Sequence, residues 1–306
     1  MAAFLLRRLL RALVTLWAVL TLVFLLIHAT GNPIAVLAPQ QMTLAERARL
    51  AAALGLNQPL SEQYLRFLAG VLHGNLGISY YSGMPAMPLL LARVPVTLEL
   101  VALSLAIAVA IGLPLGVAAA VWPASLADRM VRGLSVLGAS VPTFFLGILL
   151  IFFFSVEFNL LPASGGGGLV HFIMPAVTLA LFRIAFFTRL VRSALLETLS
   201  MPYVRTARAK GLAERMVVLK HALRPASLPL VTVFGLQFGQ LFAGTVITET
   251  IFALPGMNRM ALQALYRLDY PVILSYILVA AAMFIAINLM MDILYGLIDP
   301  RVRRAA

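Results

Sequence analysis

The residues of this sequence that could perform chemistry are few and far apart. The four histidines, His28, His73, His171 and His221, are not neighbours, none sits in an HExxH pattern, and the chain has no cysteine. A glycine run at 165–168 lacks the following Gly-Lys pair that a phosphate-binding loop requires. No GxSxG motif or pair of carboxylates within an apolar stretch is present. The sequence therefore predicts no metal site, no cofactor bound by this chain and no catalytic group.

Charged residues gather instead in one segment, residues 190–226. Eight basic residues lie from Arg189 to Arg224, with only Glu197 and Glu214 to oppose them. Each charged side chain costs about 2.5–3.5 kcal/mol at the centre of a bilayer, so placing ten of them there is prohibitive. We interpret the segment as a long cytoplasmic loop and expect function to be concentrated in it.

The local pattern of this loop predicts two helices. Pro202 suits the first turn of a helix, residues through Lys210 extend it, and Gly211 stands where a left-handed cap would fall. A second helix is predicted by one apolar stripe, which consists of Leu212, Met216, Leu219 and Leu223. Two interpretations follow: the loop is anchored to anionic lipid, or it is a rigid element through which a cytoplasmic motor pushes on adjoining helices.

The composition is that of a membrane protein. Apolar residues make up 62% of the chain, charged residues only 11%, and the mean hydropathy is +1.00. A typical soluble domain carries about 25% charged residues, so this chain has too few polar residues to cover a surface in water. The excess apolar residues must face lipid.

Six stretches have the roughly 20 apolar residues that a membrane-crossing helix needs. They are residues 9–29, 97–121, 133–156, 172–190, 227–250 and 272–297. Between the first two lies a mixed segment, 30–96, with helical patches at Leu44–Leu54 and Pro59–Leu72. The glycines of Gly112-xxx-Gly116 could allow close approach of another helix. The predicted fold class is an all-α membrane protein with six transmembrane helices and a small extracytoplasmic subdomain.

The distribution of Lys and Arg predicts the orientation, because cytoplasmic loops near spans carry the excess. With the N-terminus inside, the inner segments hold sixteen basic residues and the outer segments six. We therefore expect a multi-span membrane protein with both termini in the cytoplasm. This placement accounts for the net charge of +12 without any nucleic acid.

Polar residues within the spans are candidates for a translocation path, because ionisable groups are costly inside a membrane. Arg183 lies near the middle of the fourth span and could attract a substrate carboxylate. The alternatives are a structural partner, such as Glu249, Asp292 or a carbonyl group, which we favour, and a side chain that extends along the helix toward the membrane surface. Gln237 and Gln240 are three residues apart and share a helix face, where they could line the path or join helices. Asn288 completes this candidate set.

The loop also carries motifs that resemble a known family. The run Tyr203–Gly211, read as YVRTARAKG, and the later His221-Ala222-Leu223-Arg224 resemble the signature loop of the dipeptide/oligopeptide/nickel family of ABC permeases. Pro225 stands where the family has Asn. Further similar motifs run nearly end to end: Gly31-Asn32-Pro33, Leu54 to Leu60, Gly74 to Gly77, Pro255-Gly256, Asp269-Tyr270-Pro271, Asn288 to Tyr295 and Ile298 to Arg301.

The resemblance implies one of two permease subunits of a type I ABC importer for di- or oligopeptides. Its partners would be a homologous permease, two cytoplasmic ATPase subunits that use ATP and Mg, and a periplasmic substrate-binding protein. The implied organisation is a first helix (1–29), a periplasmic subdomain (30–96), a permease core (97–297) and a cytoplasmic tail (298–306). The implied ATPase-coupling residues are Tyr203, Arg205, Thr206, Ala207, Arg208, Ala209, Lys210 and Gly211.

Alternatives remain open for both the class and the substrate. Glutathione, opine-like compounds or a nickel chelate could replace the peptide in the same kind of importer. A stand-alone secondary transporter is a different class, and transport by the purified chain without ATP would favour it. A membrane-embedded enzyme would need catalytic residues that the sequence does not contain.

Overall fold

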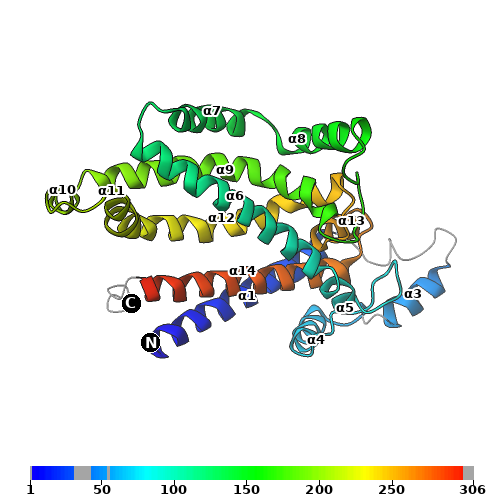
Figure 1. The fold of residues 1–306 in the computed structure, drawn as a ribbon. Helices are drawn as coiled ribbons and strands as arrows, with labels where there is room; N and C mark the ends of the chain where they lie inside the picture. Colours follow the sequence, from blue (N-terminus) through cyan, green and yellow to red (C-terminus); the bar gives the residue numbers. More distant parts are fainter. Residues whose placement is uncertain (1, 31–42, 54–55, 299–306) are drawn as a thin grey trace. The chain divides into compact units, whose positions relative to one another are not determined.

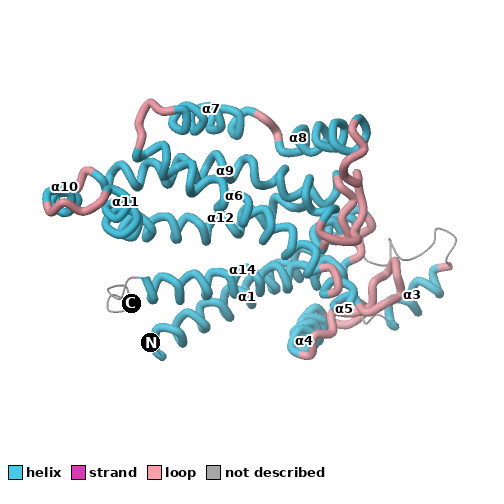
Figure 2. Tube along the Cα trace, viewed as in Figure 1, coloured by secondary structure: helices cyan, strands magenta, loops and turns pink. Residues whose placement is uncertain are grey.

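The computed structural model describes residues 2–30, 43–53 and 56–298. In these ranges the chain consists of helices joined by loops and forms no strand (Figure 2); a lone bridge pairs Ile78 with Pro85. Its contacts define two units, residues 1–95 with 256–286 and residues 96–255 with 287–306. The predicted motif Gly31-Asn32-Pro33 and nearly all of the predicted tail, 299–306, lie outside the described residues.

The first unit contains one long helix and several short ones (Figure 1). They are α1 (Ala2–Thr30), α3 (Leu44–Ala53), α4 (Leu60–Leu72), α5 (Ala86–Leu91), α13 (Met257–Tyr266) and the first part of α14 (Tyr270–Ile298). Helices α3 and α4 confirm the two patches predicted in the mixed segment. The Ser79 hydroxyl donates to Asp269 at 2.5 Å, and the Tyr80 N–H donates to the same carboxylate at 3.1 Å. These bonds tie the loop after α4 to the turn between α13 and α14.

The second unit is organised around α9 (Val170–Leu199). Helices α7 (Leu126–Ser140), α8 (Thr143–Leu150) and α12 (Leu223–Ile251) pack against it, and α6 (Val94–Val121) shares its apolar core (Figure 1). A Cβ at Gly116 would lie 2.8 Å from the Thr188 carbonyl oxygen, so only glycine permits this approach of α6 to α9. The predicted close contact at Gly112-xxx-Gly116 is confirmed.

Three described segments are long and apolar enough to cross a membrane: Ala86–Val121, Val170–Leu199 and Tyr270–Met291. Leu10–Leu26 and Thr143–Glu157 are shorter apolar helices. The prediction of one continuous helix over 133–156 is wrong. The helix stops at Ser140, and Pro142 is the N-cap of α8, because proline has no N–H to donate and disfavours helical backbone at the residue before it.

The boundaries of the charged segment also differ from the prediction. Helix α9 continues to Leu199, nine residues past the predicted end of the fourth span. On the other side, α11 (Glu214–Met216) and the π-helical η2 (Val217–Ala222) run directly into α12. The expected loop of more than thirty residues is therefore mostly helix. Only residues 200–213 interrupt it, and these include one short helix, α10 (Pro202–Ala209).

Candidate functional site

Helix α10 is built by local signals at its two ends. Pro202 occupies the first turn, where a missing N–H leaves no hydrogen bond unmade. The N–H of Lys210 donates to the Thr206 carbonyl oxygen at 3.0 Å, and Gly211 then adopts the left-handed conformation with φ of +76°. The helix and the cap predicted from the sequence are confirmed.

One face of α10 is buried and anchors the helix to the second unit. Val204 is 0% exposed and Ala207 6%, and both pack against the fully buried Val217 of η2. The remaining residues of the candidate set are exposed: Tyr203, Arg205, Thr206, Arg208, Ala209, Lys210 and Gly211. Ala207 thus belongs to the anchor. Val204 is an anchor residue that the sequence analysis did not single out, although its spacing of three from Ala207 was visible.

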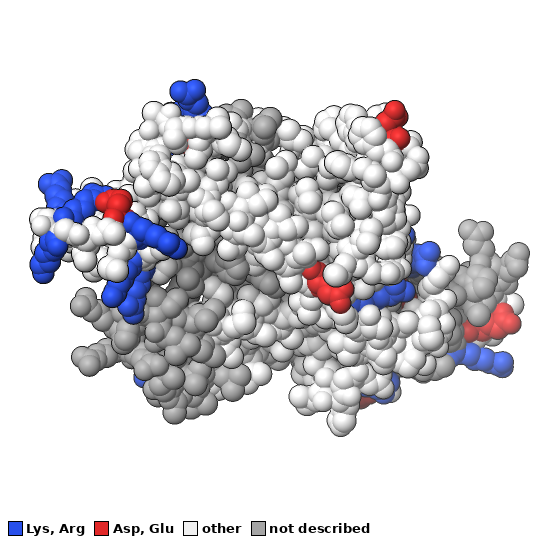
Figure 3. All heavy atoms as spheres, viewed as in Figure 1, with Lys and Arg blue, Asp and Glu red and all other residues white. Residues whose placement is uncertain are grey.

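The exposed face of α10 is strongly basic. Lys and Arg side chains gather over α10 and α11 (Figure 3). Arg208 donates two hydrogen bonds to Glu214, at 2.6 and 3.1 Å, and the bond from Arg208 is the main cause that lowers the pKa of the Glu214 carboxyl. This pair links the end of α10 to the start of α11. The other basic side chains leave a positive surface for an acidic partner or for anionic lipid.

The apolar stripe predicted for the second helix forms the packed face only at its two ends. Leu212 and Leu223 are partly buried and pack against apolar clusters, but Met216 and Leu219 are 48% and 50% exposed, and Val217, Val218 and Ala222 are buried instead. The reason is the π-helical turn of η2, which shifts the side chains relative to α-helical spacing. Counting every third and fourth residue therefore selected the wrong residues in the middle of the stripe.

A buried carboxylate joins the α6–α7 turn to α9. Asp128 is 2% exposed and accepts hydrogen bonds from the Ala124 N–H at 3.1 Å and from Arg192 Nε at 2.8 Å. Arg132 approaches its other side at 3.3 Å. The Ala124 hydrogen bond and then the two arginines lower the pKa of Asp128. Sequence analysis missed this residue, because nothing local shows that Arg192 of another helix reaches it.

Arg183 joins α9 to α12 through neutral partners. Its guanidinium donates to the amide oxygen of the buried Gln237 and, at 3.2 Å, to that of the exposed Gln240. It also lies 5.3 Å from the centroid of the Phe182 ring. Asn288 is half-buried on α14.

The acidic partners considered for Arg183 do not appear among its contacts. Glu249 hydrogen-bonds with Thr97 at 2.6 Å, and the side chain of Asp292 lies outside the described residues. Arg183 is 8% exposed, so a positive charge sits in the unit with only amide oxygens and a ring against it among the described residues. Such a charge favours an anion that reaches it, because buried charges without a counter-ion are unfavourable.

Comparison with protein families gives two adjoining matches that together span nearly the whole chain. Residues 112–304 match the "binding-protein-dependent transport system inner membrane component" model, and residues 1–101 match its N-terminal companion. The chain belongs to this family. It is accordingly a multi-pass inner-membrane permease component, and the resemblance predicted from the signature loop is confirmed.

Several curated relatives align with it over almost their full length. The chain is 40% identical to the dipeptide transport system permease protein DppB of Escherichia coli (strain K12), covering 99% of each chain. It is also 40% identical to the glutathione transport system permease protein GsiC of Salmonella paratyphi A, again covering 99% of each. The probable peptide ABC transporter permease protein y4tP of Sinorhizobium fredii is 37% identical, covering 99% of this chain and 100% of the relative.

Solved structures support the fold. A chain of the MetNI methionine ABC transporter in inward-facing conformations aligns with a TM-score of 0.58 at 23% identity, covering 70% of this chain and 97% of that one. An amino acid ABC transporter aligns with a TM-score of 0.52 at 19% identity, covering 70% and 94%. At these identities the likeness establishes the helical permease fold and nothing about the solute.

Proposed function

We propose that this chain is one of two permease subunits of an ATP-driven importer that moves di- or oligopeptides across the inner membrane. Six spans place both termini in the cytoplasm. A homologous permease completes the translocation path, a periplasmic binding protein delivers the solute, and two cytoplasmic ATPases hydrolyse ATP. The predicted division into residues 1–29, 30–96, 97–297 and 298–306 belongs to this proposal.

The observation that carries the proposal is the construction of α10. A short basic helix is fixed on its inner face by Val204 and Ala207 against Val217 of η2, and η2 runs directly into α12. A push on the exposed face is therefore passed to α9 and α12 as a rigid-body movement rather than absorbed by a flexible loop. This rigidity favours a docking element for an ATPase over a loop that only rests on lipid.

The path residues proposed are Arg183, Gln237, Gln240 and Asn288. Hydrogen bonds to a charged group contribute about 1.5–3 kcal/mol, so losing an Arg183 contact to a passing carboxylate should slow uptake roughly 10- to 100-fold. We expect Arg183→Met to do so and Arg183→Lys to keep part of the activity. Arg189→Met, an exposed arginine of the same helix, is the matched control; equal uptake by wild type and Arg183→Met would remove Arg183 from the path.

The direct test of the proposed function is uptake of a labelled dipeptide in cells with and without this protein, with excess glutathione or nickel as competitors. Uptake that needs the protein and resists both competitors supports a peptide importer. Glutathione is the second candidate solute, because GsiC is as similar to this chain as DppB is. Blockage by glutathione would favour it. Transport by the purified chain without ATP would contradict the importer assignment altogether.

A further inference from the structure

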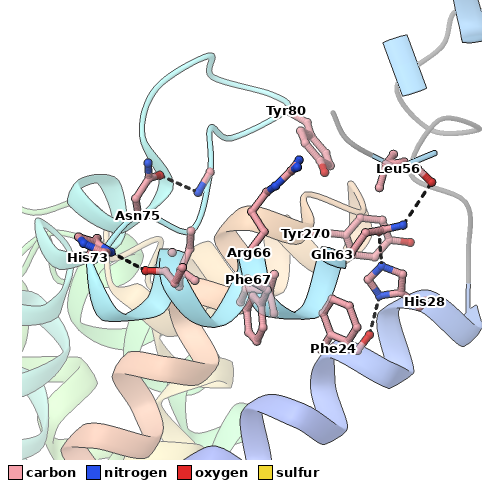
Figure 4. Close-up of a pocket in the computed structure, with 15 residues that line it drawn as sticks. Phe24, His28, Leu56, Gln63, Arg66, Phe67, His73, Asn75, Tyr80 and Tyr270 are labelled. Carbon is pink, nitrogen blue, oxygen red and sulfur yellow. Dashed lines mark hydrogen bonds between the residues drawn. The ribbon is translucent and has the colours of Figure 1, made fainter. Parts of the chain in front are cut away.

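We propose that a pocket in the first unit binds the carboxylate end of a short apolar solute. This inference rests on the proposed function, since a peptide with a free C-terminus has that chemistry. The pocket lies between α1, α4, the loop that follows α4, and the start of α14, all within the first unit (Figure 4). It is a different site from the Arg183 cluster, which belongs to the second unit.

The size and walls of the pocket fit a small molecule with an apolar part. Its volume is about 560 Å³, within the range of roughly 300–1,000 Å³ of most ligand pockets. Phe24 and Phe67 stack at 5.5 Å between ring centroids, and Tyr80 meets Tyr270 edge to face at 6.4 Å. The rings come from α1, α4, the following loop and α14, so an aromatic or aliphatic side chain would find apolar contacts on several sides.

The polar side of the pocket has a basic side chain that an anion would complement. Arg66 projects from α4 among the residues drawn in Figure 4, and it makes no hydrogen bond or ion pair with any residue that the structure describes. None of the described residues that line the pocket is acidic. The planar guanidinium forms two parallel hydrogen bonds with a carboxylate, so a carboxylate is the group that would complete this site.

The side chains of Gln63 and His28 hold each other in the same wall of the pocket. The Gln63 amide nitrogen donates to the carbonyl oxygens of Gln58 at 2.8 Å and Leu56 at 3.3 Å, which turns its oxygen toward His28. His28 Nε2 lies 3.0 Å from that oxygen, and Nδ1 lies 2.8 Å from the Phe24 carbonyl oxygen. Both side chains are therefore engaged within the wall, and Arg66 is the group available for contact with a ligand.

The test is equilibrium binding of labelled Ala-Phe to the purified transporter complex in phosphatidylcholine nanodiscs, without ATP or binding protein. The C-terminal amide of the same dipeptide is the comparison ligand. We expect the free acid to bind at least tenfold tighter than the amide, and Arg66→Gln to abolish this difference. Arg66→Lys should retain part of it. Arg49→Gln, which removes an exposed arginine of α3 outside the pocket, should leave it unchanged.

Three outcomes would overturn the proposal. The first is equal binding of the free acid and the amide by the wild-type complex. The second is an equal loss of binding in Arg66→Gln and Arg49→Gln. The third is Arg66-dependent retention of phosphatidylglycerol by the complex with no preference for the free acid, which would identify a lipid headgroup as the ligand. Cellular uptake separates this inference from the proposed function. Normal peptide uptake together with peptide binding that does not depend on Arg66 would refute the pocket alone. Arg66-dependent binding without any peptide uptake would refute the peptide importer alone.

Discussion

Truncating Val204 tests whether the apolar anchor holds α10 in place. Val204→Ala removes two methyl groups from a side chain that is 0% exposed, at about 0.8 kcal/mol each. The higher helix propensity of alanine offsets about 0.5 kcal/mol of this loss. The net cost is about 1.1 kcal/mol, or roughly a sixfold shift toward the undocked helix. The Arg208–Glu214 pair is 42% and 50% exposed, so Glu214→Gln should cost only about 0.5 kcal/mol.

Hydrogen exchange of the purified complex measures this difference directly. Amides of residues 203–211 should exchange roughly sixfold faster in Val204→Ala and roughly twofold faster in Glu214→Gln, and those of α9 and α12 should be unchanged. Val156→Ala, at a side chain that is 61% exposed, is the matched control and should have no effect. Faster exchange in Glu214→Gln than in Val204→Ala would refute the reasoning. If α10 is the docking element, Val204→Ala should also reduce uptake per ATP hydrolysed.

Three further predictions concern single residues. Gly211→Ala should destabilise the end of α10 by about 1–2 kcal/mol, because φ is +76°, whereas Gly211→Asn should cost less; equal exchange in both would contradict this. The lowered pKa of Asp128 stabilises the fold above about pH 4, its ordinary range, and this contribution is lost as pH falls further. The difference in melting temperature between wild type and Asp128→Asn should therefore become smaller from pH 6 to pH 3. The corresponding difference for Glu157→Gln, an exposed-site control, should not. The pKa of Tyr80 is raised to about 12, mainly by burial and then by Asp269, so stability should fall as pH rises from 10 through 12. A spectrophotometric titration should place Tyr80 lower in Asp269→Asn but still above 10.

The elements that the sequence predicts well are those whose signals lie within a few residues. Proline in the first turn and glycine at a left-handed position bracket α10, so both its ends could be placed in advance. The same holds for α4, which Pro59 precedes and the turn His73-Gly74-Asn75 follows. The family assignment rests on motifs whose order and spacing are specific, so the comparisons confirm it.

Features that depend on a single backbone event were harder to predict. A hydropathy count over 133–156 averages across Val141-Pro142 and cannot detect that the helix stops there. The stripe assigned to Met216 and Leu219 assumed α-helical spacing, and a π-helical turn moved Val217 and Val218 inward instead. In both places the composition was interpreted correctly. The backbone geometry, which decides which residues face the core, cannot be read from composition alone.

The partners of Arg183 are decided by how α9 and α12 pack, which the sequence position of the charge does not reveal. Its position within an apolar helix marks it as unusual from the sequence alone, but an acidic partner could be sought in Glu249 or Asp292. The register of α9 against α12 instead presents Gln237 and Gln240 to the guanidinium. Amide oxygens satisfy its hydrogen bonds without cancelling its charge. A carboxylate that reached this cluster would gain both the hydrogen bonds and the Coulomb attraction, whereas an acidic side chain in the same place would already have neutralised it. If Arg183 lines the proposed path, its neutral partners leave a positive charge there that anionic groups can approach and leave.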